Sequence, residues 1–217
     1  MKFILGKKEY MTQLFDESGK VVPGTVVSAG PMYVLELKKG KPSTTKSKTG
    51  TYDSMVIGYG ERNLKNVNKP QKGLIKKALA EREKGFTIIR EFNNKKSALP
   101  EVGVGGVIDA STFAQGDKVV VSSISKGKGF QGVVKRHHFE GGRRSHGQKH
   151  SEREPGSIGA GGKQRVMPGM RMAGRMGTDR ITSKNCIVSR VDADKNLIFI
   201  KGAIAGRKGT LVEIVVK

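Results

Sequence analysis

The sequence predicts a mainly β protein, a barrel or a sandwich, which one helix and one long basic segment interrupt. Most of its apolar runs have the length of a strand, and turn-forming residues separate them. Helical periodicity is found at residues 71–84, whereas residues 126–177 hold few core-forming side chains. A chain of 217 residues is long enough for one sizeable core with appendages.

The first sixty residues contain a series of short apolar runs that predict strands. The turn sequence DESG at 16–19 separates two of them, so that one strand leads out and the next returns. Residues 38–50 are rich in Lys, Ser, Thr and Gly, which predicts an exposed loop. The strands predicted in this part are 2–5, 11–15, 21–27, 31–37 and 52–59.

One helix is predicted at residues 71–84, inside a small α+β insertion at 60–96. It follows Pro70, and Gly85 is well placed to end it. Its outer face is mostly Lys, Arg and Glu, which favours an ordinary surface helix. The apolar residues that share its inner face are Leu74, Ile75, Ala78 and Leu79.

The rest of the chain returns to strand patterns on both sides of the basic segment. We therefore expect residues 1–125 to form the first part of a β core and 178–217 to complete it, with 126–177 as an extension between them. Residues 93–110 are loop-rich, 192–196 form a turn and 202–209 a glycine-rich loop. The strands predicted here are 86–92, 117–125, 180–191, 197–201 and 210–216.

The single cysteine, Cys186, allows no internal disulfide and no cysteine metal cluster. It lies in the alternating run NCIVSRV, which predicts a small core residue. No run of 18 apolar residues predicts a transmembrane helix, and the start MKFILGKKEY is too weakly apolar for a signal peptide. With no basic amphipathic helix in view either, we expect no membrane partner.

The basic segment, residues 126–177, has a composition of its own. It carries 12 Lys and Arg against 3 Glu, together with all four histidines and 13 glycines. From Lys135 to Ser157, Phe139 is the only large apolar side chain. Such a segment buries too little surface to offset its ordering entropy, so it is disordered alone or held by a partner. Its charge, in a chain of net charge +22, indicates that this partner is a polyanion.

This composition predicts nucleic-acid binding. Lys and Arg neutralise phosphates, and the guanidinium group suits bidentate contact. Aromatic and histidine rings stack on unpaired bases, while glycines let the backbone approach closely. The residues expected to contact RNA are Lys126, Lys128, Phe130, Lys135, Arg136, His137, His138, Arg143, Arg144, His146, Lys149, His150, Arg153, Lys163, Gln164, Arg165, Arg171 and Arg175, with Arg207 and Lys208 of the glycine-rich loop.

A metal site is an alternative, because His146 and His150 are four residues apart and two further histidines lie nearby. The residues between them form helices poorly, and the Glu of the zinc-protease motif is missing. We therefore expect no metal.

A nucleotide site is a second alternative, because residues 127–132 match GxGxxG after a predicted strand. The valines at 133–134 and the glycines at 141–142 argue against the helix that should follow. A P-loop before Lys163 also fails, since Ser157 stands where Gly is required. With no paired carboxylates and no nucleophile–histidine pattern, we expect no enzyme, no cofactor and no small-molecule substrate.

These same residues closely resemble large-subunit ribosomal protein three, the L-three family, in its bacterial form. The N-terminal residues 4–31 and the run VDADKNLIFIKGAIAGRKG at 191–209 are similar to the two ends of that family. The motifs of the basic segment that carry the resemblance are KGKGFQGVVKR at 126–136, HG at 146–147, PGSIGA at 155–160 and MAGRMG at 172–177.

The resemblance implies a β-barrel core at the outer face of the large ribosomal subunit. It also implies a long extension that threads into ribosomal RNA toward the peptidyl transferase centre, and an early role in subunit assembly. The partners would be large-subunit ribosomal RNA and neighbouring large-subunit ribosomal proteins, in the cytoplasm. The other reading of the residues is a nucleic-acid-processing enzyme whose basic arm guides its substrate.

Two positions depart from the family's pattern. Glu9-Tyr10 stands where the family commonly has a small or apolar residue followed by Gly, and we expect this to alter a local turn. Some bacterial members carry a methylated glutamine just after GSIG. In this chain residues 160–162 (AGG) occupy that place, and Gln164 lies two residues beyond.

Overall fold

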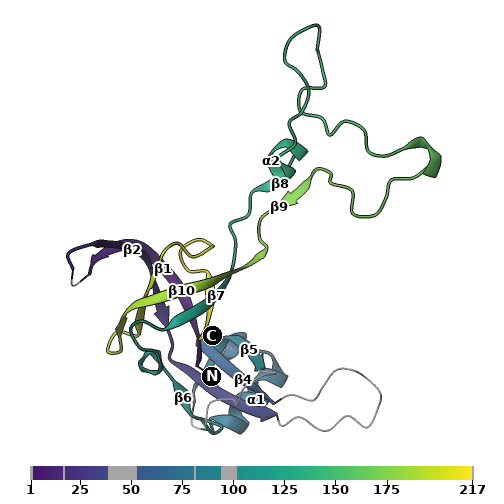
Figure 1. Ribbon diagram of the computed structural model, residues 1–217. Coiled ribbons are helices and arrows are strands. Elements are labelled where there is room, and N and C mark those ends of the chain that lie inside the picture. Colours follow the sequence, from purple (N-terminus) through teal and green to yellow (C-terminus); the bar gives the residue numbers. More distant parts are fainter. Residues whose placement is uncertain (1, 17, 39–52, 81, 94–101, 217) are drawn as a thin grey trace. The chain divides into compact units, whose positions relative to one another are not determined.

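The computed structural model describes residues 2–16, 18–38, 53–80, 82–93 and 102–216 (Figure 1). Most of the loop predicted at 38–50, and part of the loop-rich stretch at 93–110, lie outside the described residues. The described chain divides into two compact units, Met1–Ile124 with Ile181–Lys217, and Ser125–Arg180.

Six of the described strands close into a β-barrel, which confirms the prediction of a mainly β fold and selects the barrel over the sandwich. The pairs β1–β12, β12–β7, β1–β2 and β2–β11 are all antiparallel (Figure 1). In barrel order the strands are β1 (Phe3–Phe15), β12 (Leu211–Val216), β7 (Lys118–Ile124), β10 (Arg180–Asp192), β11 (Leu197–Lys201) and β2 (Val21–Ala29).

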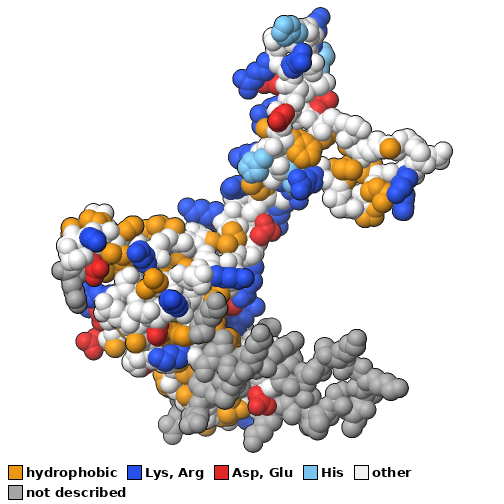
Figure 2. Space-filling model, in the orientation of Figure 1, with side chains coloured by type: hydrophobic (Ala, Val, Ile, Leu, Met, Phe, Trp, Pro, Cys, Tyr) orange, Lys and Arg blue, Asp and Glu red, His pale blue; other side chains and the backbone are white. Residues whose placement is uncertain are grey.

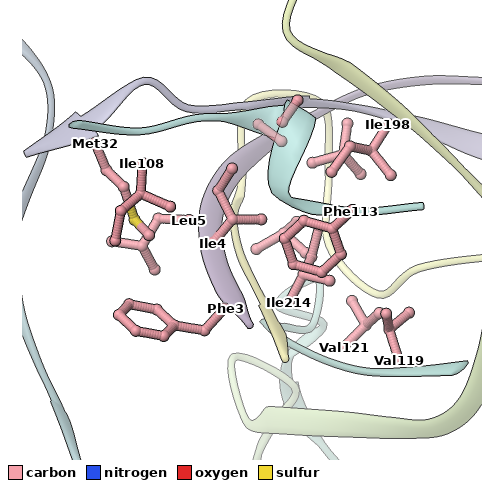
Figure 3. Close-up of a cluster of buried hydrophobic side chains, with 14 of the residues drawn as sticks. Phe3, Ile4, Leu5, Met32, Ile108, Phe113, Val119, Val121, Ile198 and Ile214 are labelled. Atoms are coloured by element: carbon pink, nitrogen blue, oxygen red, sulfur yellow. The ribbon is translucent and has the colours of Figure 1, made fainter. Parts of the chain in front are cut away.

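Rows of paired aliphatic side chains fill the barrel. Ile4 of β1 lies opposite Ile214 of β12, which lies opposite Val121 of β7, and each is at most 1% exposed. Alternate residues of a strand face opposite sides, so these three all point inward. Figure 3 shows Ile4 and Ile214 beside Phe113, which belongs to the same cluster.

A second sheet of four strands packs beside the barrel within the same unit. The side chains of β4 alternate between its faces: Met55 and Ile57 join the barrel cluster, whereas Val56 packs with Ile75 of the helix. One face of this sheet therefore extends the barrel core, and α1 covers the other. The elements are β5 (Lys84–Asn93), β4 (Ser54–Asn63), β3 (Met32–Lys38) and β6 (Val107–Ile108) in sheet order, with η1 (Leu64–Asn66), α1 (Lys69–Ala78) and η2 (Ala110–Thr112).

The predicted helix exists, but its C-terminal boundary was wrong. α1 ends at Ala78, and Leu79 already leaves helical geometry with φ −140° and ψ 77°. β5 begins at Lys84 and pairs with Asn63, so the chain must leave the helix before that residue, whatever its local propensity. Gly85 lies in that strand and does not cap the helix.

The two strands predicted at 2–5 and 11–15 are one continuous strand of 13 residues, β1. Its register shifts between Lys8 and Met11, which is a β-bulge. Glu9 and Tyr10 lie in this bulge, so the departure from the family pattern falls within a bent strand. Glu9 contacts Lys208, with Oε2 3.8 Å from Nζ.

Two polar groups mark the margin of the core. The Tyr59 hydroxyl donates a hydrogen bond of 3.1 Å to the carbonyl oxygen of Ser28, and burial raises the pKa of Tyr59 to about 12. Cys186 packs at the edge of the barrel cluster and is half-buried, which raises the pKa of its thiol. The core position predicted for Cys186 is therefore a marginal one.

Every helix in the described ranges is too short and too polar to cross a lipid bilayer.

Candidate nucleic-acid interface

The unit Ser125–Arg180 starts and ends in a stem in which its two chain ends run together. The Lys128 N–H donates to the carbonyl oxygen of Met176 at 2.9 Å, and the Ser125 N–H donates to that of Asp179 at 2.9 Å. Above them β8 (Gly129–Gln131) pairs antiparallel with β9 (Gly174–Met176). Backbone pairing, which needs few apolar side chains, thus closes the base of this unit.

The stem requires glycine at position 177. Gly177 has φ +79°, and a Cβ there would collide with the carbonyl oxygen of Lys126. We expect Gly177→Ala to open the stem, so that the Lys128 amide loses protection in hydrogen-exchange measurements. Gly159→Ala is the matched control, since a Cβ there meets nothing within 4 Å. Equal protection of Lys128 in both variants would contradict this role of Gly177.

A helix of five residues, α2 (Val133–His137), follows β8, although the sequence argued against a helix at this place. Gly132 caps its start, and a contact distant in sequence holds its end: the Arg136 Nη1 donates to the carbonyl oxygen of Met172 at 2.7 Å. His137 Nε2 lies 3.1 Å from the same oxygen. The expectation failed because the two valines oppose a helix only through local propensity, which tertiary contacts override. One short turn of helix does not make the GxGxxG match a nucleotide site.

The chain then forms a loop that closes on itself at residues 141–152. The Gly142 N–H donates to the carbonyl oxygen of Glu152 at 2.9 Å. Gly141 has φ +80°, and a Cβ there would strike the same oxygen, so only glycine permits this approach. The Arg144 guanidinium pairs with the Glu152 carboxylate. The tip beyond this closure carries Arg143, His146, Lys149 and His150, all of them exposed.

A second loop runs through residues 157–173 and contains the short helix η3 (Gly161–Lys163). Gln164 follows it in the left-handed conformation, with φ 47°. This loop also presents apolar side chains that the sequence prediction did not include. Their signal is the cluster VMPGMRM, whose spacing fits neither a strand nor a helix. The exposed members are Val166, Met167, Met170 and Met172, each 37–41% exposed.

Nearly all residues of the unit Ser125–Arg180 are exposed or only partly buried. All of its residues are described, and Val133 is the only one among them that is buried. Every residue from Glu140 to Ala173 is exposed. Figure 2 shows Lys, Arg and His side chains spread over this surface with few acids between them. The arrangement has no core, and its cations are exposed.

The structure places eighteen of the twenty predicted RNA-contacting residues in this unit and two in the other. Arg207 and Lys208 lie in the loop after β11, and both are exposed. That loop is held firmly, because Lys8 Nζ donates to the carbonyl oxygen of Ile204 at 2.6 Å and Ser123 Oγ donates to that of Ala205 at 2.9 Å.

Some of the predicted contact residues already interact within the unit, and others do not. Arg136 and His137 contact the carbonyl oxygen of Met172, and Arg144 pairs with the Glu152 carboxylate, so these three help to shape the unit. Phe130 is 77% exposed, which leaves a ring face open to stack on a base. Over the described part of the chain, no three His, Cys, Asp or Glu residues come together in a way that could hold a metal ion.

Comparison with known proteins covers this unit and most of the remaining chain. The family model of Ribosomal protein L3 matches residues 56–196, which include the whole of Ser125–Arg180. Large ribosomal subunit protein uL3 of Desulfitobacterium hafniense is 46% identical over 211 residues, covering 97% of this chain and 93% of that protein. The protein of the same name from Streptomyces coelicolor is 46% identical over 213 residues (98% and 94%), and that from Chlorobium phaeobacteroides 44% over 216 residues (99% and 98%). The resemblance seen in the sequence is thereby confirmed, and the chain belongs to the ribosomal protein L3 family.

Proposed function

We propose that this chain binds large-subunit ribosomal RNA directly, through the extension 126–177 and with help from the loop 202–209. As a member of the L3 family it is a structural constituent of the large ribosomal subunit, and it is not an enzyme. The reading as a nucleic-acid-processing enzyme is therefore set aside.

The observation that carries this proposal is the exposed, coreless run from Glu140 to Ala173 inside a segment of charge +9. Without a partner, such a run does not become ordered, because it buries too little apolar surface to offset the loss of conformational entropy. Ribosomal RNA supplies the packing contacts that the run lacks, and its phosphates supply the negative charge that neutralises the cations.

The side chains divide into two chemical roles. Lys and Arg of the tip and stem, such as Arg143, Lys149 and Lys128, meet phosphates and set affinity. Rings such as Phe130 and His146 stack on unpaired bases, which is how RNA loops are recognised. The exposed Gln164 amide can both donate to and accept from a base edge.

We also propose that the extension reaches toward the peptidyl transferase centre and that the chain joins the subunit early in assembly. A segment with no core must be enclosed by RNA on several sides to become ordered. RNA that folds around a chain already in place achieves this readily, whereas threading the closed loop 141–152 into finished RNA is obstructed. The other partners we propose are neighbouring large-subunit ribosomal proteins.

Without RNA, residues 143–162 should be mobile on the picosecond-to-nanosecond timescale. Heteronuclear NMR relaxation of the isolated chain should give order parameters below about 0.6 there, against about 0.85 in the barrel strands. Adding ribosomal RNA should raise the values of this segment. Rigid values without RNA would show that the segment has stabilising contacts of its own.

Co-sedimentation tests the proposal directly. A tagged copy of the chain should sediment with large ribosomal subunits at one copy per subunit, and ultraviolet crosslinks to ribosomal RNA should map to 126–177 and 202–209. A chain that stays in the soluble fraction, or that crosslinks to RNA only through other residues, would contradict it.

A further inference from the structure

A dense run of positive charge lies outside the extension, around helix α1. Residues 62–77 hold six Lys and Arg and no acid. This is more than twice the net charge per residue of the segment 126–177, which carries 12 cations and 3 acids over 52 residues. The run belongs to the barrel unit, so its charge is separate from that of the extension.

Helix geometry gathers three of these cations on one face. Lys69, Lys72 and Lys76 follow the spacing i, i+3, i+7, which places their side chains in one row. The helix cannot turn this row inward, because Ile75 is 1% exposed and packs with Val56 and other apolar side chains of the sheet. Lys69 and Lys76 are exposed, and Lys72 is partly so.

Helix stability does not account for this pattern. The positive end of the helix dipole is at the N-terminus, where acids stabilise and cations oppose it. The first turn of α1 nevertheless has no acid, no side-chain cap, and Lys69 and Lys72 in place. Like charges three and four residues apart also repel each other, as in the pair Lys72 and Lys76. Lys69 and Lys72 therefore cost the free helix stability, and a polyanion would relieve that cost, whereas Lys76 lies in the last turn, where the dipole favours a cation.

The acids that the structure describes do not neutralise the row. No described carboxylate pairs with Lys69, Lys72 or Lys76. Glu61, the nearest acid before the run, is engaged elsewhere, with Oε2 2.6 Å from Lys84 Nζ. A hydrogen bond from Lys84 lowers the pKa of Glu61, so this acid stays ionised and bound to its own partner.

We propose that Lys69, Lys72 and Lys76 form a second RNA-binding surface, on which α1 contacts the phosphate backbone of ribosomal RNA. The inference rests on the proposed function and extends it to the barrel unit. Lysine ammonium groups on flexible stems suit phosphates, which carry no sequence information, so this surface positions the barrel unit and does not read bases.

The test compares the full-length chain with the variant K69Q/K72Q/K76Q in binding to transcribed large-subunit ribosomal RNA over a series of salt concentrations. Three lost phosphate contacts should flatten the slope of log affinity against log salt by about 2 to 3 units, at roughly 0.7 to 0.9 per phosphate. Hydroxyl-radical footprinting should lose one patch of RNA protection and keep the patches of the extension.

The control variant K20Q/K184Q/K195Q removes the same charge from exposed positions of the same unit, and it should leave the slope and the footprint nearly unchanged. Glutamine forms helices about as well as lysine, so the thermal midpoint of the α1 variant should not fall. A fall in that midpoint without a change in slope would overturn the proposal, because the row would then be structural.

The possible failures can be told apart. No binding by the unaltered chain would contradict the proposed function itself. Normal binding by both variants would overturn only the assignment to α1. If the slope is unchanged but assembled subunits lose a neighbouring protein at this face, the row meets an acidic protein and the RNA assignment is wrong.

Discussion

Replacing residues 143–164 with a short Gly-Ser turn should weaken binding to large-subunit ribosomal RNA and leave the barrel unit folded. The deletion removes five cations, Arg143, Arg144, Lys149, Arg153 and Lys163. If each meets a phosphate, the slope of log affinity against log salt flattens by about 4 units, at roughly 0.7 to 0.9 per phosphate. Filter binding between low and moderate salt measures the slope.

The deletion should leave the stability of the barrel unit nearly unchanged, because neither of the described core clusters includes a residue of 125–180. The stem also survives, since β8 still pairs with β9 and Arg136 still reaches Met172. The thermal midpoint should therefore stay within a degree or two of the full-length value, as surface changes away from packed features cost within about 0.5 kcal/mol.

A matched variant separates charge from length. Changing the same five cations to Gln in the full-length loop should give nearly the same flattening, because phosphate neutralisation depends on charge. Arg144 already pairs with Glu152, but both side chains are well exposed, so that pair competes only weakly with RNA. Full-length slope and affinity in both variants would mean that the extension is not an RNA anchor.

The strands of the barrel were largely predictable from local pattern. The predicted bounds of β11, 197–201, are the observed ones, and those of β12 differ by one residue, because each is a short, mostly apolar run that follows turn or loop residues. β1 was divided into two because the polar residues Lys7 to Tyr10 resemble a turn. The bulge that carries them through the strand depends on pairing with β2, which local pattern does not contain.

The candidate interface was predictable in composition but not in shape. Charge and the lack of apolar residues identified the extension, since both are properties of the sequence alone. Its internal contacts join residues far apart, such as Arg136 with Met172 and Gly142 with Glu152, and no local rule gives them. The sequence places the lysines of α1 on its outer face, opposite Ile75, but each of them fits an ordinary solvated helix face, so local pattern does not single out the row as a binding surface.

Ile214→Ala should be among the most destabilising single changes in the barrel, at about 2–5 kcal/mol. Ile214 is fully buried and lies in β12 between β1 and β7, so truncation opens a cavity that three strands share. Its neighbours Ile4 and Val121 are fixed by backbone pairing and cannot move in to fill the space. Urea unfolding should show a lower midpoint with little change in the m-value.

Ile181→Ala is the matched control for this change, because it makes the same truncation in barrel strand β10 at a side chain that is 44% exposed. It should cost no more than about 1 kcal/mol, the range of strand propensity. Ile214→Val, which removes a single methyl group, should lower the free energy of unfolding by about 0.5–1.5 kcal/mol, less than Ile214→Ala does. Where the Ala variant remains folded, its salt slope for RNA should equal that of the unaltered chain, because β12 supplies none of the proposed phosphate contacts. If the Ala changes at positions 214 and 181 lower the free energy of unfolding equally, packing around Ile214 does not stabilise the barrel.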